Sequence, residues 1–122
     1  MSRMSALTPK DRDRLSQLEQ VQPAVRKAHG LVEQFAAAPK EAEHIAGNLR
    51  RTFAQLKMRF TAIGFDRLAQ MATGLETTAR RGLSHGPKSR ALREGLGSLN
   101  RQIDLERRTV IAQAARDSEK AE

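Results

Sequence analysis

The chain has 122 residues, a formal net charge of +8 and an isoelectric point of about 11.0. This length predicts one domain that can bury a core without stabilising cross-links. The absence of cysteine excludes both a disulfide framework and a thiolate metal site. No apolar run approaches the roughly 18 residues of a membrane span, and the N-terminus lacks the apolar core of a signal peptide. We therefore expect a cytoplasmic protein that does not bind membranes.

The composition favours helices. The chain contains four Phe and no Trp or Tyr, and it is rich in residues that form helices rather than strands. We expect an all-α fold, an antiparallel four-helix bundle with an additional short N-terminal helix. The scarcity of aromatic rings also argues against binding single-stranded nucleic acid by base stacking.

The first helix is predicted to start at Thr8-Pro9, because Thr8 can cap free N–H groups, Pro9 suits the first helical position and Asp11 favours the positive first turn. Pro23 is expected to stop or kink this helix, so we predict two helices that meet there. Residues 1–7 and 117–122 are expected to be flexible tails around a single bundle domain, residues 8–116.

A second pair of helices is predicted around Gly64, which fits the left-handed position after a helix. The preceding helix is expected from Pro39 or Lys40 to about Ile63, and the following one from about Asp66 to Arg81. A loop over 83–87 then leads to the last helix. Apolar residues recur at helical spacing on both sides of Gly64 and again in the last helix. They are Ile45, Leu49, Phe53, Leu56, Phe60 and Ile63, then Leu68, Met71 or Ala72, Leu75 and Ala79, and finally Leu92, Leu96, Leu99, Ile103, Val110 and Ile111.

This hairpin resembles the central hairpin of the histidine-containing phosphotransfer (HPt) domain, whose pattern is His-x-Leu-Lys-Gly-(Ser/Ala)-Ala-x-x-(Leu/Ile)-Gly followed by a second helix. The resemblance covers about residues 25 to 112. The chain departs from the pattern at Ala54, which stands where the family has its phosphorylated histidine, and at Met58, which replaces a glycine. The matching residues are Leu56, Lys57, Ile63, Gly64, Leu68, Leu75 and Glu76.

The resemblance implies a surface that docks a response-regulator receiver domain or a histidine kinase. Alanine has no nucleophile, so phosphotransfer at Ala54 is chemically excluded. The cations around it are interpreted either as an ordinary solvated helix face or as a docking patch for an acidic receiver pocket. Met58 is either an apolar anchor or a residue that blocks close approach. The residues expected to bind the partner are Arg50, Arg51, Ala54, Gln55, Lys57, Met58 and Thr61.

No cofactor, metal site or catalytic constellation is predicted, and we expect no enzyme. His44 is the best substitute phospho-acceptor, although an ordinary surface histidine is the better interpretation because its neighbours do not reproduce the motif. His29 is placed within a helix and His85 in a flexible loop.

The first hypothesis is a two-component or phosphorelay signalling protein, a non-phosphorylatable HPt-like binding module. One alternative is a basic helical protein that contacts nucleic-acid phosphates, because cations recur along the whole chain. Another is a true phosphotransferase in which Ala54 is an engineered substitution. A homo-oligomer that uses the helix from Leu92 to Val110 as its seam is a further hypothesis, and the oligomeric state stays open.

Overall fold

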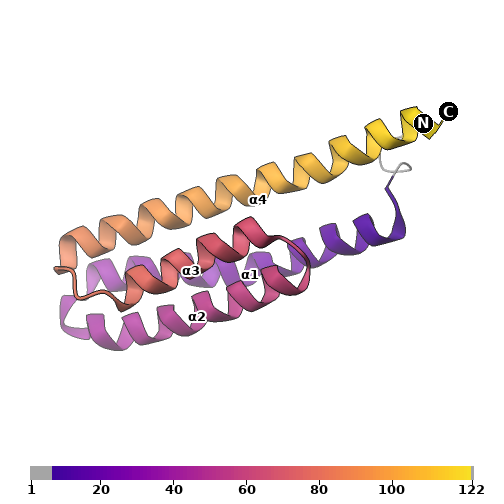
Figure 1. The fold of residues 1–122 in the computed structure, drawn as a ribbon. Coiled ribbons are helices and arrows are strands. Elements are labelled where there is room, and N and C mark those ends of the chain that lie inside the picture. The colour runs from indigo at the N-terminus through magenta and orange to yellow at the C-terminus, as the bar shows by residue number, and fades with distance from the viewer. Residues whose placement is uncertain (1–6, 122) are drawn as a thin grey trace.

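The computed structural model describes residues 7–121, and this range is all-helical. Successive α-helices run in opposite directions, with the α2–α3 turn at one end and the other two connections at the opposite end (Figure 1). No helix in the described range is long and apolar enough to cross a membrane. The elements are α1 (Pro9–Ala37), the 3-10 turn η2 (Pro39–Glu41), α2 (Ala42–Ala62), α3 (Asp66–Arg80) and α4 (His85–Ala121).

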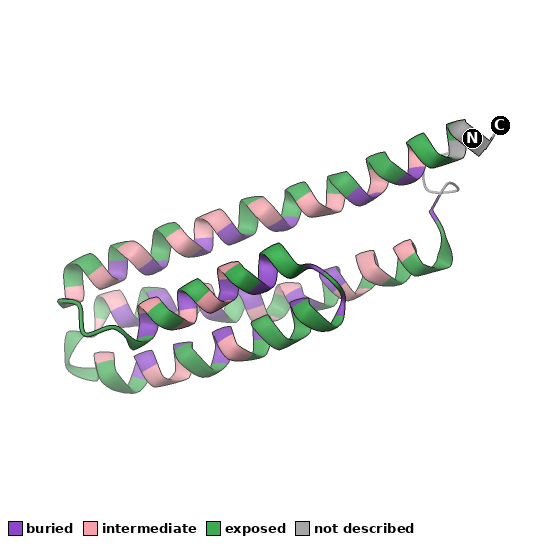
Figure 2. Cartoon of the chain, viewed as in Figure 1, coloured by how far each residue is buried: buried purple, intermediate pink, exposed green. Residues whose placement is uncertain are grey.

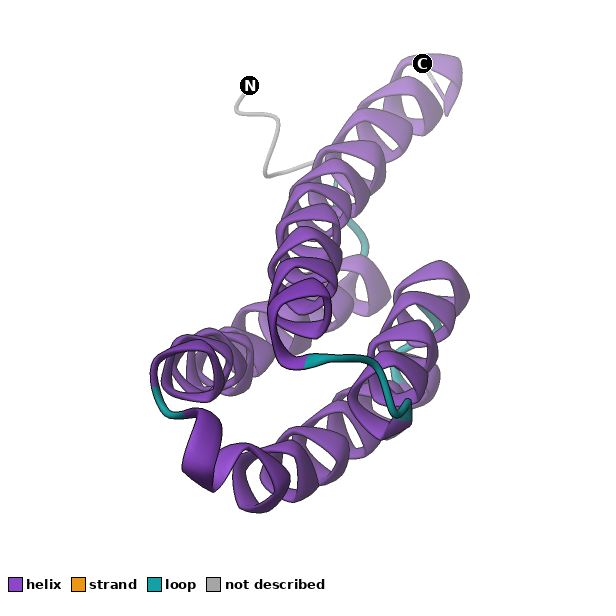
Figure 3. Cartoon of the chain, turned by 90° about the vertical axis from the view of Figure 1, so that its left-hand side faces the viewer, coloured by secondary structure: helices purple, strands orange, loops and turns teal. Residues whose placement is uncertain are grey.

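The four helices share one apolar core. Helix α1 packs against α2 and α4, and α3 packs against the same two helices, most extensively against α2. The end-on view in Figure 3 shows the helices around a common interior, and Figure 2 shows the buried positions as stripes along them. The largest fully buried side chains are Phe53, Phe60, Leu18, Leu49, Leu56, Leu68, Leu92, Leu96, Leu99, Val21, Val25 and Val32.

Helix α1 begins as the sequence predicts. The Thr8 hydroxyl accepts a hydrogen bond from the backbone N–H of Asp11 at 3.1 Å, and proline occupies the first turn. Leu7, which the sequence assigns to a tail, is buried in the core. The rest of that expected tail, residues 1–6, lies outside the described range.

Among the described residues there is no additional short N-terminal helix, because α1 runs through Pro23 without interruption. Pro23 itself is exposed, whereas Val21 and Val25 on either side of it are buried. An interior proline removes one hydrogen bond and crowds the preceding turn, but the apolar stripe keeps its spacing across that position. The prediction of two helices was therefore wrong because burial of this stripe outweighs the local cost of proline.

The turn after α2 has the geometry expected from its glycine. Gly64 has φ +81°, its N–H donates to the Thr61 carbonyl at 3.1 Å, and the Phe65 N–H donates to the Phe60 carbonyl at 2.9 Å. These two bonds form a Schellman motif, which satisfies carbonyls that the helix end leaves free. The motif turns the chain directly into α3.

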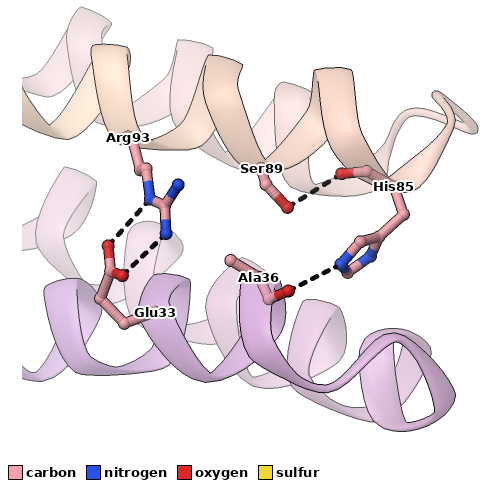
Figure 4. A network of polar contacts seen from close by, with 5 residues as sticks. All are labelled: Glu33, Ala36, His85, Ser89 and Arg93. Carbon is pink, nitrogen blue, oxygen red and sulfur yellow. Dashed lines mark hydrogen bonds and ion pairs between the residues drawn. The ribbon is translucent and has the colours of Figure 1, made fainter.

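Helix α4 begins at His85, so the prediction that this histidine lies in a flexible loop was wrong. The His85 ring stacks on Phe35 of α1 with ring centres 4.8 Å apart, and His85 Nε2 lies 3.1 Å from the Ala36 carbonyl oxygen. Figure 4 shows the ring reaching across to α1, while the Ser89 hydroxyl bonds to the His85 carbonyl. At its other end α4 continues to Ala121, through the segment from Asp117 that was expected to fray.

Candidate functional site

The residues expected to bind a partner form one side of α2, which we call the α2 face. They recur at spacings of three and four, and this spacing keeps them opposite the buried stripe. Ala54 is half-buried, whereas the other six residues are exposed, and Met58 has 72% of its surface accessible. The α2 face consists of Arg50, Arg51, Ala54, Gln55, Lys57, Met58 and Thr61.

The cations of the α2 face do not form one compact cluster. The Arg51 guanidinium bonds to the Asn48 side chain, and both residues line a pocket that Lys27 of α1 also lines. Arg50 turns the other way and lies back over Gly47, where a Cβ would be 3.7 Å from its Nη2. The positive charge is thus divided between the α1 side and the α3 side of α2.

Arg59, a further cation of α2 five residues after Ala54, belongs to a different contact. Its guanidinium donates to the Gln20 carbonyl of α1 at 3.1 Å, so it is held between the two helices. Thr61 likewise uses its hydroxyl within α2, where it donates to the Lys57 carbonyl at 2.8 Å. Neither group is as free for a partner as Lys57 or Met58.

The charge on the α2 face is uncompensated in the described part of the chain. Ion pairs there join Arg80 with Glu76, Arg93 with Glu33 and Arg108 with Asp104. Arg50, Arg51 and Lys57 make no such pair among the described residues. Cations that have no carboxylate within ion-pair distance raise the local positive potential.

Ala54 carries no nucleophile, so no phosphoryl group can be transferred at the position that matches the histidine of the HPt pattern. His44 is exposed on α2, ten residues before Ala54. His29 lies beside Asn100, whose Nδ2 is 2.6 Å from its Nε2.

A second feature, which the sequence does not predict, is a pocket of about 510 Å³ at the end of the molecule that carries the α3–α4 loop. All four α-helices and both connections at that end contribute to its wall. We call it the end pocket. Its lining residues are Phe35, Pro39, Ala42, Glu43, Ala46, Arg50, Ala79, Arg80, Arg81, Gly82, Leu83, His85 and Lys88.

Lys88 of the end pocket makes two contacts with the surrounding wall. Its ammonium donates to the Arg81 carbonyl at 2.8 Å and lies 5.7 Å above the centre of the Phe35 ring. Its pKa is lowered from the ordinary lysine value, first by partial burial and then by repulsion from Arg50, against the smaller opposing effect of Glu43. Arg50 and Lys88 both line the end pocket, so their like charges repel one another there.

No family model, curated protein or solved structure matches the chain.

The sequence located the α2 face, because helical periodicity alone separates its residues from the buried stripe. It did not locate the end pocket, whose cations Arg50, Arg81 and Lys88 are up to 38 positions apart. The available signal was the run Arg80-Arg81 followed by Lys88 around a glycine-containing loop. That run does not reveal that Arg50 lies beside it.

Proposed function

We propose that the protein is an HPt-like interaction module whose four helices form an antiparallel bundle and whose α2 face binds a receiver domain or a histidine kinase without relaying phosphate. The framework positions of the resemblance support this proposal. Leu56, Leu68 and Leu75 are buried in the core, and Gly64 has the positive φ that a tight helix-to-helix turn requires. Ala54 is half-buried, on the side of α2 opposite its buried stripe.

The observation that carries the proposal is the exposure of Met58 among uncompensated cations. A methionine with 72% of its surface accessible is a flexible apolar contact, and such side chains suit adaptable binding surfaces. Arg51 lies seven residues before it and Lys57 next to it, and neither pairs with a carboxylate among the described residues. An acidic pocket with an apolar rim would complement both features.

A module of this kind acts by covering a functional surface of its partner. Bound to a receiver domain, it would cover the acidic pocket that accepts phosphate, and so sequester the partner, block its phosphorylation or hold it in a complex. Because the attraction rests on exposed charges, association should slow as salt is added.

The first test is a titration of the isotope-labelled protein with receiver domains from its own organism, followed by amide chemical shifts. We expect saturable shifts at Arg51, Ala54, Lys57 and Met58 with at least one receiver. Met58→Glu should weaken that binding about tenfold or more, since it removes the apolar contact and adds a charge that an acidic pocket repels. Leu105→Glu is the matched control, because Leu105 is 53% exposed on α4, away from the α2 face.

A second pair of variants tests the charge. Arg51→Glu should slow association, whereas Arg101→Glu, an exposed cation on α4, should leave it unchanged. Equal effects of the two variants would mean that only net charge matters, and would count against a docking surface. Saturable shifts along α3 and α4 with duplex DNA, together with none for any receiver, would favour the nucleic-acid alternative.

The variant Ala54→His addresses the phosphotransferase alternative. If a receiver docks here in the HPt manner, the new imidazole nitrogen could attack the phosphorus of the receiver's phospho-aspartate, forming a P–N bond as the aspartate carboxylate leaves. Transfer to this variant and none to the unaltered chain would support the docking geometry. The Ala54→His variant could also bind the receiver and yet accept no phosphoryl group. If adding Met58→Gly to that variant then allowed transfer, Met58 would be identified as the residue that prevents close approach.

A further inference from the structure

The end pocket carries an excess of positive charge that the fold does not neutralise. Arg80 pairs at 2.7 Å with Glu76, a carboxylate outside the pocket wall that neutralises its charge. Arg50, Arg81 and Lys88 remain, and none of them makes an ion pair with a carboxylate in the described part of the chain. Glu43 is the one acidic residue in the wall. Three cations against one carboxylate leave a surplus of two positive charges.

This charge is built into the pocket rather than lying free on a helix face. The Lys88 ammonium donates to the Arg81 carbonyl and lies over the Phe35 ring. Arg50 folds back along α2 toward the same end, over Gly47. Helix α4 starts in the pocket wall with no acidic residue in its first turn, so the positive end of its dipole adds to the field.

We propose that the end pocket binds a small phosphate ester, with the phosphate held by Arg50, Arg81 and Lys88. A phosphate monoester carries close to two negative charges at neutral pH and offers several strong acceptor oxygens, which matches the surplus of the pocket. A bound dianion would also offset the mutual repulsion of Arg50 and Lys88, which both line the pocket.

The shape of the pocket favours an ester over free phosphate. Its volume of about 510 Å³ exceeds what one phosphate group fills. Ala42, Ala46, Ala79 and Leu83 supply an apolar wall beside the cations, and Leu83 is among the exposed large apolar residues of the chain. An organic group attached to the phosphate would bury that wall, because apolar surface gains from leaving water.

The test is a titration of the isotope-labelled full chain, at low ionic strength, with phenyl phosphate, inorganic phosphate and sulfate in separate series. We expect saturable shifts confined to the amides near Arg81, Gly82 and Lys88. Phenyl phosphate should bind more tightly than inorganic phosphate, and sulfate more weakly than either ester or phosphate.

Variants assign the binding to named residues. Arg81→Gln and Lys88→Gln should each weaken phenyl phosphate binding about tenfold, since each removes a charge-assisted contact. Arg101→Gln, an exposed cation on α4 outside the pocket, is the matched control and should bind as tightly as the unaltered chain. Far-UV circular dichroism checks that each variant is folded, and Arg81→Gln keeps the test valid if Lys88→Gln disturbs packing on Phe35.

Several results would overturn the proposal. They are the absence of saturation with both phosphate probes, affinity for sulfate equal to that for phosphate, or equal loss of binding in Arg101→Gln. Shifts spread along α4 to Arg107 and Arg108 would also overturn it, because they would indicate a general polyanion surface. Met58→Glu should leave phosphate binding intact, because Met58 does not line the pocket. Arg50 belongs to both the α2 face and the pocket, so Met58 is the residue that separates the two proposals.

Discussion

Gly95 of α4 lies against Leu75 of α3 so closely that a Cβ on Gly95 would come within 2.5 Å of Leu75 Cδ2. Leu75 is itself buried, with 4% of its surface accessible, so its side chain has little room to move away. The absence of a side chain at Gly95 therefore determines how near α3 and α4 can approach in the part of the core beside the α2–α3 hairpin.

Gly95→Ala should destabilise the protein. Alanine is favoured over glycine in a helix by about 1 kcal/mol, but overpacking a filled core costs about 1–3 kcal/mol. Gly97→Ala in the same helix is the control, because its Cβ would meet only the Arg101 side chain at 3.5 Å, and this variant should be more stable by up to about 1 kcal/mol. Urea unfolding measures the change in the free energy of unfolding for both variants. Equal stabilisation by the two would show that the Leu75 side chain moves aside without cost.

Gly64→Ala should lower the free energy of unfolding by about 1–2 kcal/mol, the cost of placing an L-residue in the left-handed region. The residue has φ +81° and no neighbouring atom crowds a Cβ there apart from Arg14 Nη2 at 3.9 Å, so the loss would come from the backbone. Gly74→Ala, in open space on α3, should instead stabilise the protein. A loss at Gly74 as large as that at Gly64 would contradict this explanation.

Arg14 connects α1 to the α2–α3 turn, and Arg14→Leu should cost about 1 kcal/mol or more. Its Nε donates to the Ile63 carbonyl at 3.2 Å, and its guanidinium carbon lies 4.5 Å from the centre of the Phe65 ring. The variant keeps most of the apolar stem but leaves the carbonyl unpaired and removes the cation from the ring. Arg12→Leu, at an exposed position of the same helix, is the control in thermal unfolding and should change stability little.

Pro23→Ala should stabilise the protein, because α1 already continues through this position and alanine would restore one backbone donor. Helix propensity favours alanine over proline by about 3 kcal/mol, and the greater entropy of the unfolded alanine chain offsets about 0.4–1 kcal/mol of that gain. We expect a net increase of about 2 kcal/mol in urea unfolding. A decrease would mean that α1 depends on the geometry that proline imposes.

The ion pair between Glu33 and Arg93 should make a small contribution to stability that is lost in acid (Figure 4). Two hydrogen bonds from the Arg93 guanidinium, at 2.9 and 2.8 Å, hold the pKa of Glu33 below its ordinary value. A lowered carboxyl pKa stabilises the fold above the unfolded-state pKa, and that contribution disappears as the pH falls through the folded-state value.

Glu33→Gln should therefore lower the melting temperature slightly at neutral pH and low salt, and the difference should vanish in acid and shrink as salt is added. The effect is small because the two side chains are 62% and 52% exposed. Glu94→Gln, at an exposed position on α4, is the control. A difference that persists unchanged at a pH below both pKa values would contradict the assignment to the carboxylate charge.

Much of the fold could be predicted from the sequence because it depends on neighbours along the chain. The cap at Thr8 depends on a hydroxyl that accepts a hydrogen bond from the backbone N–H three residues later. The turn at Gly64 depends on one residue that tolerates a positive φ. The buried and exposed sides of α2 depend on helical periodicity, which separated Phe53 and Leu56 from Met58. These properties are local, so the order of residues determined them.

Other features came only with the tertiary structure, since they depend on groups distant in sequence. Burial of Val21 and Val25 holds α1 together across Pro23, where local rules predict a break. Stacking on Phe35 stabilises His85 as the first residue of α4. Packing between helices brings Arg50 and Lys88 into the wall of one pocket, although the two cations repel each other and no local preference would place them together. The helix faces of this protein were thus determined by its sequence pattern, and the juxtaposition of its charges was decided by packing between helices.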